Sequence, residues 1–260
     1  MTVQDIISAV EEFAPLCIQE SWDNSGLIIG RPQDTVSGVM LGFDCTRELV
    51  EAAVAAGCNM VITHHPLIFK GIRSINEDCP VGAAISAAIR SGVAVYAAHT
   101  TADKVREGVS GAMAAKLGLQ DVTFLEDGPE GFGLGCIGNL AKPVSGGDAL
   151  AMVKEAFGLK IIRSSKPIDG PISRVAVLGG SGGGEIGLAM RAGAQLYISA
   201  DISYHDFFVP EGFMVMDIGH FESEVEIVGI LMAQIRKKFP NFAVCIEPGL
   251  NGSNPVHYYV

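Results

Sequence analysis

The sequence predicts an α/β protein built from two similar parts, each with a parallel sheet that helices cover on both faces. Short, continuous apolar runs alternate with helical segments along most of the 260 residues, which is typical of parallel strands buried on both faces. Successive strand ends also recur at similar spacing, 20 residues apart at Asp44 and His64 and 21 apart at Gly180 and Asp201. A chain of this length buries roughly 70% of its unfolded surface, so it can form a core without disulfides.

The first part is expected to open with an amphipathic helix at 3–13. Thr2 and Asp5 have the spacing of a capping box, and apolar residues follow at helical intervals. Thr46 is expected to cap the second helix, which Gly57 ends. The other expected features of this part are a polar turn at 21–26, an apolar run at 27–29, strands at 39–43, 59–63 and 93–98, and helices at 81–91 and 104–117.

The second part follows a less regular stretch at 119–170, where glycines separate weak strand signals. We place the domain junction at 120–130, which gives an N-terminal part at 1–125 and a second part at 126–260. The expected elements of the second part are strands at 174–178, 195–199, 213–217 and 242–247, and helices at 147–157, 185–192 and 222–238.

The composition excludes several classes of protein. With 18 basic and 29 acidic side chains the net charge is −11, which repels phosphate backbones, so nucleic acid is not expected as the main partner. No apolar stretch approaches the roughly 18–20 residues of a membrane span, and the N-terminus lacks a secretory signal. The six cysteines are scattered without a CxxC pair, as in proteins with reduced thiols. We therefore expect a cytoplasmic protein that does not associate with membranes.

Four of the six histidines follow the carboxyl ends of expected strands. In open parallel sheets, ligands bind outside these strand ends. A carboxylate stands four residues after two of the histidines, which places both side chains on one face if a helix begins there. The collected set is His64, His65, His99, Asp103, His220 and Glu224.

Imidazole and carboxylate groups together suit zinc, iron, manganese, cobalt or nickel. Five or six ligands are too many for one catalytic ion, which typically takes three. They suit two divalent ions about 3.5–4 Å apart. Adjacent histidines on an extended segment point in opposite directions, so a bend near Pro66 is needed if His64 and His65 are both ligands. The alternative is that each histidine only caps or hydrogen-bonds a strand end.

A glycine-rich turn offers a competing interpretation. Gly182–Gly187 matches GxGxxG between a strand and a helix, and Asp201 lies 19 residues after Gly182, at the next strand end. This is the context of a dinucleotide-binding fingerprint, which would make the protein a nicotinamide-dependent oxidoreductase. Several registers of the motif fit, however, and a tight turn without nucleotide is the favoured interpretation.

Smaller signals concern substrate contacts. Trp22, the only tryptophan, is expected to anchor the core, with a stacking platform beside Asn24 as the alternative. His205 either carries protons near the site or lies on the surface. Lys70, five residues after His65, either anchors an anionic substrate or is solvated.

The motifs together resemble the NIF-three-like dinuclear-metal family, often called GTP cyclohydrolase type 2 homologues. Those that carry the resemblance are Trp22–Leu27 (WDNSGL), Ile62–Lys70 (ITHHPLIFK), Ala98–Asp103 (AHTTAD), Gly179–Gly182 (GGSG), Asp201–His205 (DISYH) and Asp217–Glu224 (DIGHFESE). One departure is visible in the third motif, which is commonly HTNLD in the family. The spacing of His99 and Asp103 is nevertheless kept.

The resemblance implies two α/β subdomains, a toroidal homohexamer and a two-metal centre. Its usual ligands correspond to His64, His65, Asp103, His220 and Glu224, so the segment 213–260 is expected to return to the metal site. His99 then becomes a neighbouring or substrate-facing residue.

The resulting functional hypothesis is a metal-dependent hydrolase of a small, anionic, nucleotide-like substrate. His99 and His205 would move protons, and Trp22, Asn24 and Lys70 would bind the substrate. Two divalent ions would make the site locally electropositive on an acidic protein. The alternative is a metal-binding hexameric scaffold or adaptor without significant turnover.

Overall fold

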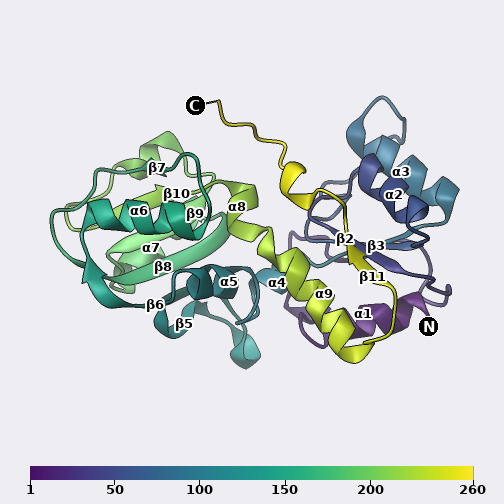
Figure 1. The fold of residues 1–260 in the computed structure, drawn as a ribbon, viewed down its shortest axis with the longest axis horizontal. Coiled ribbons are helices and arrows are strands. Elements are labelled where there is room, and N and C mark those ends of the chain that lie inside the picture. The colour runs from purple at the N-terminus through teal and green to yellow at the C-terminus, as the bar shows by residue number, and fades with distance from the viewer. Residues whose placement is uncertain (260) are drawn as a thin grey trace. The chain divides into compact units, whose positions relative to one another are not determined.

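The computed structural model describes residues 1–259. It divides into two compact units, each with its own sheet (Figure 1). Unit 1 contains Met1–Ala102 and Ile227–Pro255, and unit 2 contains Asp103–Glu226 with the tail from Val256. Unit 1 is therefore made of two chain segments separated by most of unit 2. The domain boundary expected from the sequence, between 1–125 and 126–260, stays a prediction.

Unit 1 has a five-stranded sheet in the order β1-β4-β3-β2-β11. Neighbouring strands are parallel except for β1, which pairs antiparallel with β4. The strands are β1 (Gly26–Ile29), β2 (Val39–Gly42), β3 (Met60–Thr63), β4 (Ala94–Ala97) and β11 (Val244–Ile246). The helices are α1 (Val3–Glu11), α2 (Arg47–Ala55), α3 (Pro80–Ser91) and α9 (Glu226–Lys238), with short 3-10 turns η1 (Leu16–Ile18) and η5 (Leu250–Gly252).

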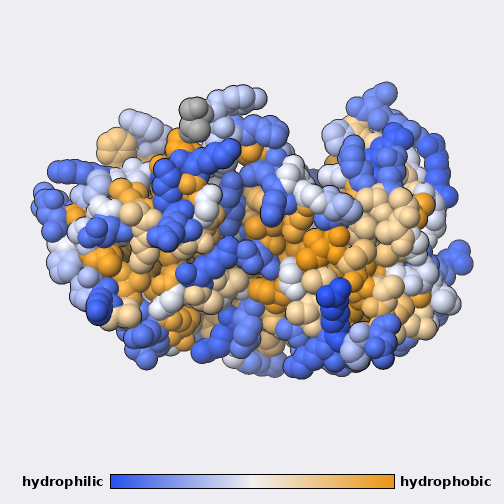
Figure 2. All heavy atoms as spheres, in the orientation of Figure 1, coloured by the Kyte–Doolittle hydropathy of each residue, from blue (hydrophilic) through white to orange (hydrophobic). Residues whose placement is uncertain are grey.

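Local sequence explains where the helices of unit 1 begin and end. Thr2 and Asp5 form the predicted capping box, and Thr46 accepts a hydrogen bond from the Leu49 amide at the start of α2. Helix α3 ends at Gly92, whose φ of 66° suits glycine. Apolar side chains of α2 and α3 pack against the sheet, whereas hydrophilic side chains cover the outer edge of the unit above these helices (Figure 2).

Unit 2 has a six-stranded sheet in the order β5-β6-β8-β9-β10-β7. Strands β8, β9 and β10 are parallel, and the other three pair antiparallel with their neighbours. The strands are β5 (Gln120–Asp127), β6 (Gly133–Val144), β7 (Arg163–Ser164), β8 (Ile172–Ser181), β9 (Leu196–Ala200) and β10 (Met214–Asp217). The helical elements are α5 (Val109–Lys116), α6 (Gly146–Ala156), α7 (Ile186–Arg191), α8 (His220–Glu224), η2 (Pro129–Gly131), η3 (Gly183–Glu185) and η4 (Tyr204–Phe207).

Helices cover both faces of the unit 2 sheet. Val177 of β8 packs in one core with residues of α5 and α6, whereas its neighbour Ala176 packs in a second core with Ala189 of α7. This alternation is expected for a strand buried on both faces. Of the residues described, no helix is long and apolar enough to cross a membrane.

The predicted α/β architecture with two sheets and helices is confirmed, but the sheets, which were expected to be parallel, are mixed and also contain antiparallel strands. The stretch at 119–170, where only weak strand signals were expected, contains the two long antiparallel strands β5 and β6, and the predicted helix at 104–117 begins only at Val109. The predicted helix at 222–238 is divided into α8 and α9. The short helix α4 (Thr100–Asp103) joins the two units along the chain.

Candidate metal centre

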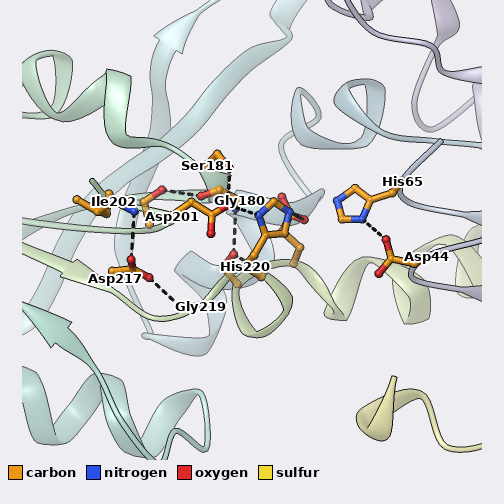
Figure 3. Close-up of polar contacts among 12 residues, drawn as sticks. Asp44, His65, Gly180, Ser181, Asp201, Ile202, Asp217, Gly219 and His220 are labelled. Atoms are coloured by element: carbon orange, nitrogen blue, oxygen red, sulfur yellow. Dashed lines mark hydrogen bonds and ion pairs between the residues drawn. The ribbon is translucent and has the colours of Figure 1, made fainter. Parts of the chain in front are cut away.

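Three histidines of unit 1 follow the parallel strands β3 and β4, so their side chains gather at one edge of the sheet. Nδ1 of the buried His64 lies 3.0 Å from the carbonyl oxygen of Ala98. Nδ1 of His65 lies 2.8 Å from Oδ1 of Asp44, which follows the neighbouring strand β2 (Figure 3). The chain bends at residues 64–65, where the hydroxyl of Thr63 donates to the carbonyl of His65. The ring centroids of His64 and His65 lie 5.0 Å apart.

His99 is oriented by a carboxylate from the polar turn at 21–26. Its Nδ1 lies 2.7 Å from Oδ1 of Asp23, whose side chain is 0% exposed. The other oxygen of Asp23 accepts hydrogen bonds from the hydroxyls of Ser25 and Thr100. Burial alone raises the pKa of Asp23, but the bonds from His99, Thr100 and Ser25 outweigh it and hold this pKa well below its usual range. Asp23 is therefore a buried anion beside His99.

The hydrogen bonds determine which nitrogen of each ring can bind a metal. Carbonyl and carboxylate oxygens only accept, so Nδ1 is the donor in each pair and Nε2 carries the lone pair in the neutral ring. One ring nitrogen from each of His64, His65 and His99 lies within 4.8 Å of one from each of the other two. Metal-binding histidines usually donate their second nitrogen in this way, so the arrangement suits a divalent ion.

Unit 2 places His220 and Glu224 on one face of α8. Nε2 of His220 lies 3.0 Å from Oε2 of Glu224, whose side chain is 4% exposed. Two ligands of one ion at bond lengths of about 2.0–2.2 Å lie roughly 3 Å apart, which matches this spacing. Nδ1 of His220 lies 2.7 Å from Oδ2 of Asp201, so the orientation repeats that of the unit 1 histidines (Figure 3).

Asp201 holds its position through its own contacts. It has a φ of 52°, and its Oδ2 accepts a hydrogen bond from the Ser181 hydroxyl at 2.5 Å. Burial raises the pKa of Asp201, but the bonds from Ser181 and His220 outweigh it and lower this pKa. Asp201 therefore stays ionised and fixes the tautomer of His220.

The buried carboxylate of Asp217 ties together the two segments that carry Asp201 and His220. It is 6% exposed and accepts from the backbone amides of Gly219 and Ile202 (Figure 3). Arg163 donates to Asp217 at 2.7 Å and to the carbonyl of Ile202 at 3.0 Å. Because residue 219 precedes His220 and residue 202 follows Asp201, this network fixes the histidine relative to its carboxylate.

The glycine-rich turn leaves space for the side chain of Glu224. A Cβ at Gly180, where φ is 68°, would lie 2.2 Å from Oε1 of Glu224. The carbonyls of Gly180 and Gly182 accept hydrogen bonds from Ser199 and Tyr197. The turn leads into a 3-10 turn and a helix of only six residues, so the favoured interpretation of a tight turn agrees with the structure.

The other predicted site residues lie in different settings. Asp103 is the last residue of α4, the helix that directly follows His99. His205 lies on the exposed turn η4, in contact with the rings of Tyr204 and Phe208. The structure does not place His205 in hydrogen-bond contact with the carboxylates that orient the other histidines.

The expectation that Trp22 anchors the core is wrong. Trp22 is 58% exposed. The centroid of its ring lies 6.0 Å from that of His99 and 5.9 Å from that of Phe69. Phe69 was not among the predicted site residues. The Asn24 amide donates to the carbonyl of Ile68 at 2.6 Å, which joins the 21–26 turn to the loop carrying Phe69 and the exposed Lys70. The rings of Trp22 and Phe69 together form an aromatic surface beside His99.

The orienting carboxylates were also missed by the sequence interpretation. Asp44 and Asp201 stand at strand ends beside the strands that carry the histidines, so their location was a usable signal. Asp23 gave no such signal, because it is 76 residues from His99 in the chain.

Comparison with known proteins agrees with this set of motifs. A family model, Duf34/NIF3 (NGG1p interacting factor 3), matches residues 1–248. The chain belongs to this family. It is 30% identical to a Clostridium perfringens protein named GTP cyclohydrolase 1 type 2 homolog, with 92% of each chain covered. It is 32% identical to a Streptococcus pneumoniae protein of the same name, over 99% of this chain and 100% of the other.

Solved structures of Duf34/NIF3 relatives have the same fold. The Staphylococcus aureus hypothetical protein SA1388 superimposes with a TM-score of 0.91 at 26% identity, covering 100% of this chain and 99% of that one. A Bacillus cereus protein related to NIF3 also gives 0.91, at 23% identity and the same coverage. The family assignment and the fold are therefore shown together.

Proposed function

We propose that this Duf34/NIF3 chain holds two divalent metal ions and hydrolyses a small, nucleotide-like substrate. The proposed ligands are His64, His65, Asp103, His220 and Glu224. One observation carries the proposal: His64, His65, His99 and His220 each present Nδ1 to a carbonyl or carboxylate oxygen within 3.0 Å. In each of these four rings Nε2 then carries the lone pair, and this orientation is typical of histidines at metal sites.

The donor set fits ions that accept both nitrogen and oxygen ligands. Imidazole suits zinc, iron, cobalt and nickel, and the carboxylates of Asp103 and Glu224, which would help to hold the ions, also allow manganese. When bound, the ions would lower the pKa of a coordinated water and polarise the bond under attack. The two acids each add one negative charge, so they would offset only part of the charge of two divalent ions.

The residues around His99 support a role in proton transfer. Asp23 fixes the proton of the neutral ring on Nδ1, so Nε2 is the atom that accepts a proton from a reacting group. The buried Asp23 carboxylate would then stabilise the imidazolium ion. His205 is proposed as a second proton carrier, supported by its exposure on η4.

Substrate recognition is proposed for the aromatic surface beside His99. The exposed ring of Trp22 and the neighbouring ring of Phe69 provide faces on which a planar base can stack. Lys70 follows on the same loop and supplies a positive charge for an anionic group. Asn24 keeps the two loops together.

Metal analysis of protein purified without a histidine tag tests the first step. We expect about two divalent ions per chain in the wild type, as in two-metal hydrolases, and a clear loss in His64→Gln and Glu224→Gln. The matched control is His257→Gln, which changes an exposed histidine of the C-terminal tail. Less than one ion per chain, with no loss in the ligand variants, contradicts the proposal.

A screen with the metal found then tests turnover. We expect hydrolysis of a nucleotide or a related phosphoester that requires the metal and falls when His99 is replaced by Gln. Metal-dependent assembly without turnover favours a scaffold or adaptor instead. The family resemblance also leads us to propose a homohexamer, and light scattering tests it by the mass, which should be six times that of one chain.

A further inference from the structure

Two cysteines of unit 1 lie close together although they are distant in the chain. Sγ of the buried Cys58 is 3.9 Å from Sγ of Cys245, although their positions in the chain differ by 187. Cys58 lies between α2 and β3, and Cys245 is the middle residue of β11. The strand between them in the sheet is β2, so the two thiols meet across the start of that strand.

Gly38, the residue before β2, has no side chain at the place where the two thiols meet. A Cβ at Gly38 would lie 3.0 Å from Sγ of Cys58 and 3.4 Å from the Cβ of Ala243. Contacts this short are tighter than side chains normally tolerate, so glycine leaves the space that Cys58 occupies. Sγ of Cys245 lies 3.7 Å from the carbonyl oxygen of Val39, which holds it on the same side.

We propose that Cys58 and Cys245 are an oxidation site that forms a reversible disulfide within the chain. The oxidant is a low-molecular-weight disulfide such as glutathione disulfide. One protein thiolate attacks it and releases one glutathione thiolate, and the second protein thiolate then attacks the mixed disulfide and releases the other. Both thiol protons pass to the solvent or to the released thiolates, so two protein thiols are oxidised and one small disulfide is reduced to two thiols.

Exposure gives the order of these steps. Cys245 is half-buried and Cys58 is buried, so the oxidant reaches Cys245 first and Cys58 resolves the mixed disulfide. Burial and the adjacent Cys245 raise the pKa of Cys58 to about 11. The reaction is therefore slow at neutral pH and faster as the pH rises, because the thiolate is the nucleophile.

The disulfide would join the two chain segments of unit 1. Cys58 belongs to Met1–Ala102 and Cys245 to Ile227–Pro255, and residues 103–226 of unit 2 lie between them in the chain. Strand β11 is an edge strand that pairs only with β2 among the described strands. A covalent link would hold this edge in place and restrict the unfolded chain through a very long loop.

The test uses tryptic peptides of the full chain after incubation with glutathione disulfide at mildly alkaline pH. Trypsin releases Cys58 in the peptide 48–70 and Cys245 in the peptide 239–260, each as its only cysteine. We expect these two peptides to be linked in monomeric protein, the link to be lost on reduction, and two of the six thiols to disappear in a thiol titration of the denatured chain.

Variants separate the site from general thiol oxidation. Cys245→Ser should abolish the link, whereas Cys136→Ser, which changes a buried cysteine of unit 2, should keep it. Glutathione on the exposed Cys17 and Cys79, with 48–70 and 239–260 left unlinked, overturns the proposal. A link found only between two chains overturns it as well.

Discussion

Replacing Asp201 by asparagine tests whether carboxylates orient the histidines for metal binding. Asparagine tolerates the φ of 52° at this position, and its amide oxygen can still accept from Nδ1 of His220, so the backbone and the contact survive while the charge is lost. A hydrogen bond to a charged group contributes about 1.5–3 kcal/mol, against about 1 kcal/mol for a neutral one. Because the Asp201 side chain is 52% exposed, the lower part of this difference applies.

We therefore expect Asp201→Asn to weaken metal binding by about 0.5–1 kcal/mol, which is roughly a two- to fivefold loss of affinity. Titration of apo-protein with zinc or cobalt against a chromophoric chelator measures this affinity. The matched control is Asp206→Asn, an exposed acid on η4 of the same unit, which should leave the affinity unchanged. Equal affinities for Asp201→Asn and the wild type would refute the orienting role.

Three further predictions use other parts of the site. Gly180→Ala should reduce the metal content strongly, because the added Cβ would lie 2.2 Å from Oε1 of Glu224. Gly184→Ala is the control and should keep the metal content, because an added Cβ has nothing within 4 Å there. Elemental analysis of both variants checks this. The pKa of Asp23 is lower in the folded chain than in the unfolded chain, so the unfolded chain binds more protons in acid. The contribution of Asp23 to the free energy of unfolding is therefore fully present above about pH 4 and is lost as the pH falls toward the folded pKa. Urea unfolding from pH 5 to pH 3 should show this loss in the wild type and much less of it in Asp23→Asn. Trp22 is the only tryptophan and is exposed beside His99, so its fluorescence should change when a nucleotide binds, and a titration without any change would remove it from the substrate site.

Much of the fold follows from local pattern in the sequence. Buried parallel strands such as β3 and β4 are continuous apolar runs, and capping residues such as Thr2 and Thr46 place the helix starts. Because parallel strands end at one edge, the strand-end histidines of unit 1, His64, His65 and His99, can be grouped from the sequence alone. The same argument extends to Asp44, which follows β2 beside β3.

The antiparallel strands β5 and β6 gave only weak signals in the sequence, because their glycines resemble loop residues. A Cβ at Gly133 would lie 2.4 Å from Cγ of Phe124, and one at Gly138 would lie 2.8 Å from the carbonyl oxygen of Gln120. These glycines therefore let β6 approach β5 closely, a requirement that depends on the partner strand and not on the local sequence.

The role of Asp23 and the exposure of Trp22 were hidden for a similar reason. Both depend on the 21–26 turn packing against the end of β4 near His99, a contact between distant parts of the chain. A lone tryptophan is more often buried than exposed, so composition alone favoured the core.

Anomalous X-ray diffraction from crystals loaded with zinc or cobalt would locate the bound ions directly. We expect two metal peaks per chain, bound through Nε2 of His64, His65 and His220 at about 2.0–2.1 Å. Each Nδ1 should keep its bond to Ala98, Asp44 or Asp201. Metal bound through Nδ1, or peaks only at sites away from these histidines, would contradict it.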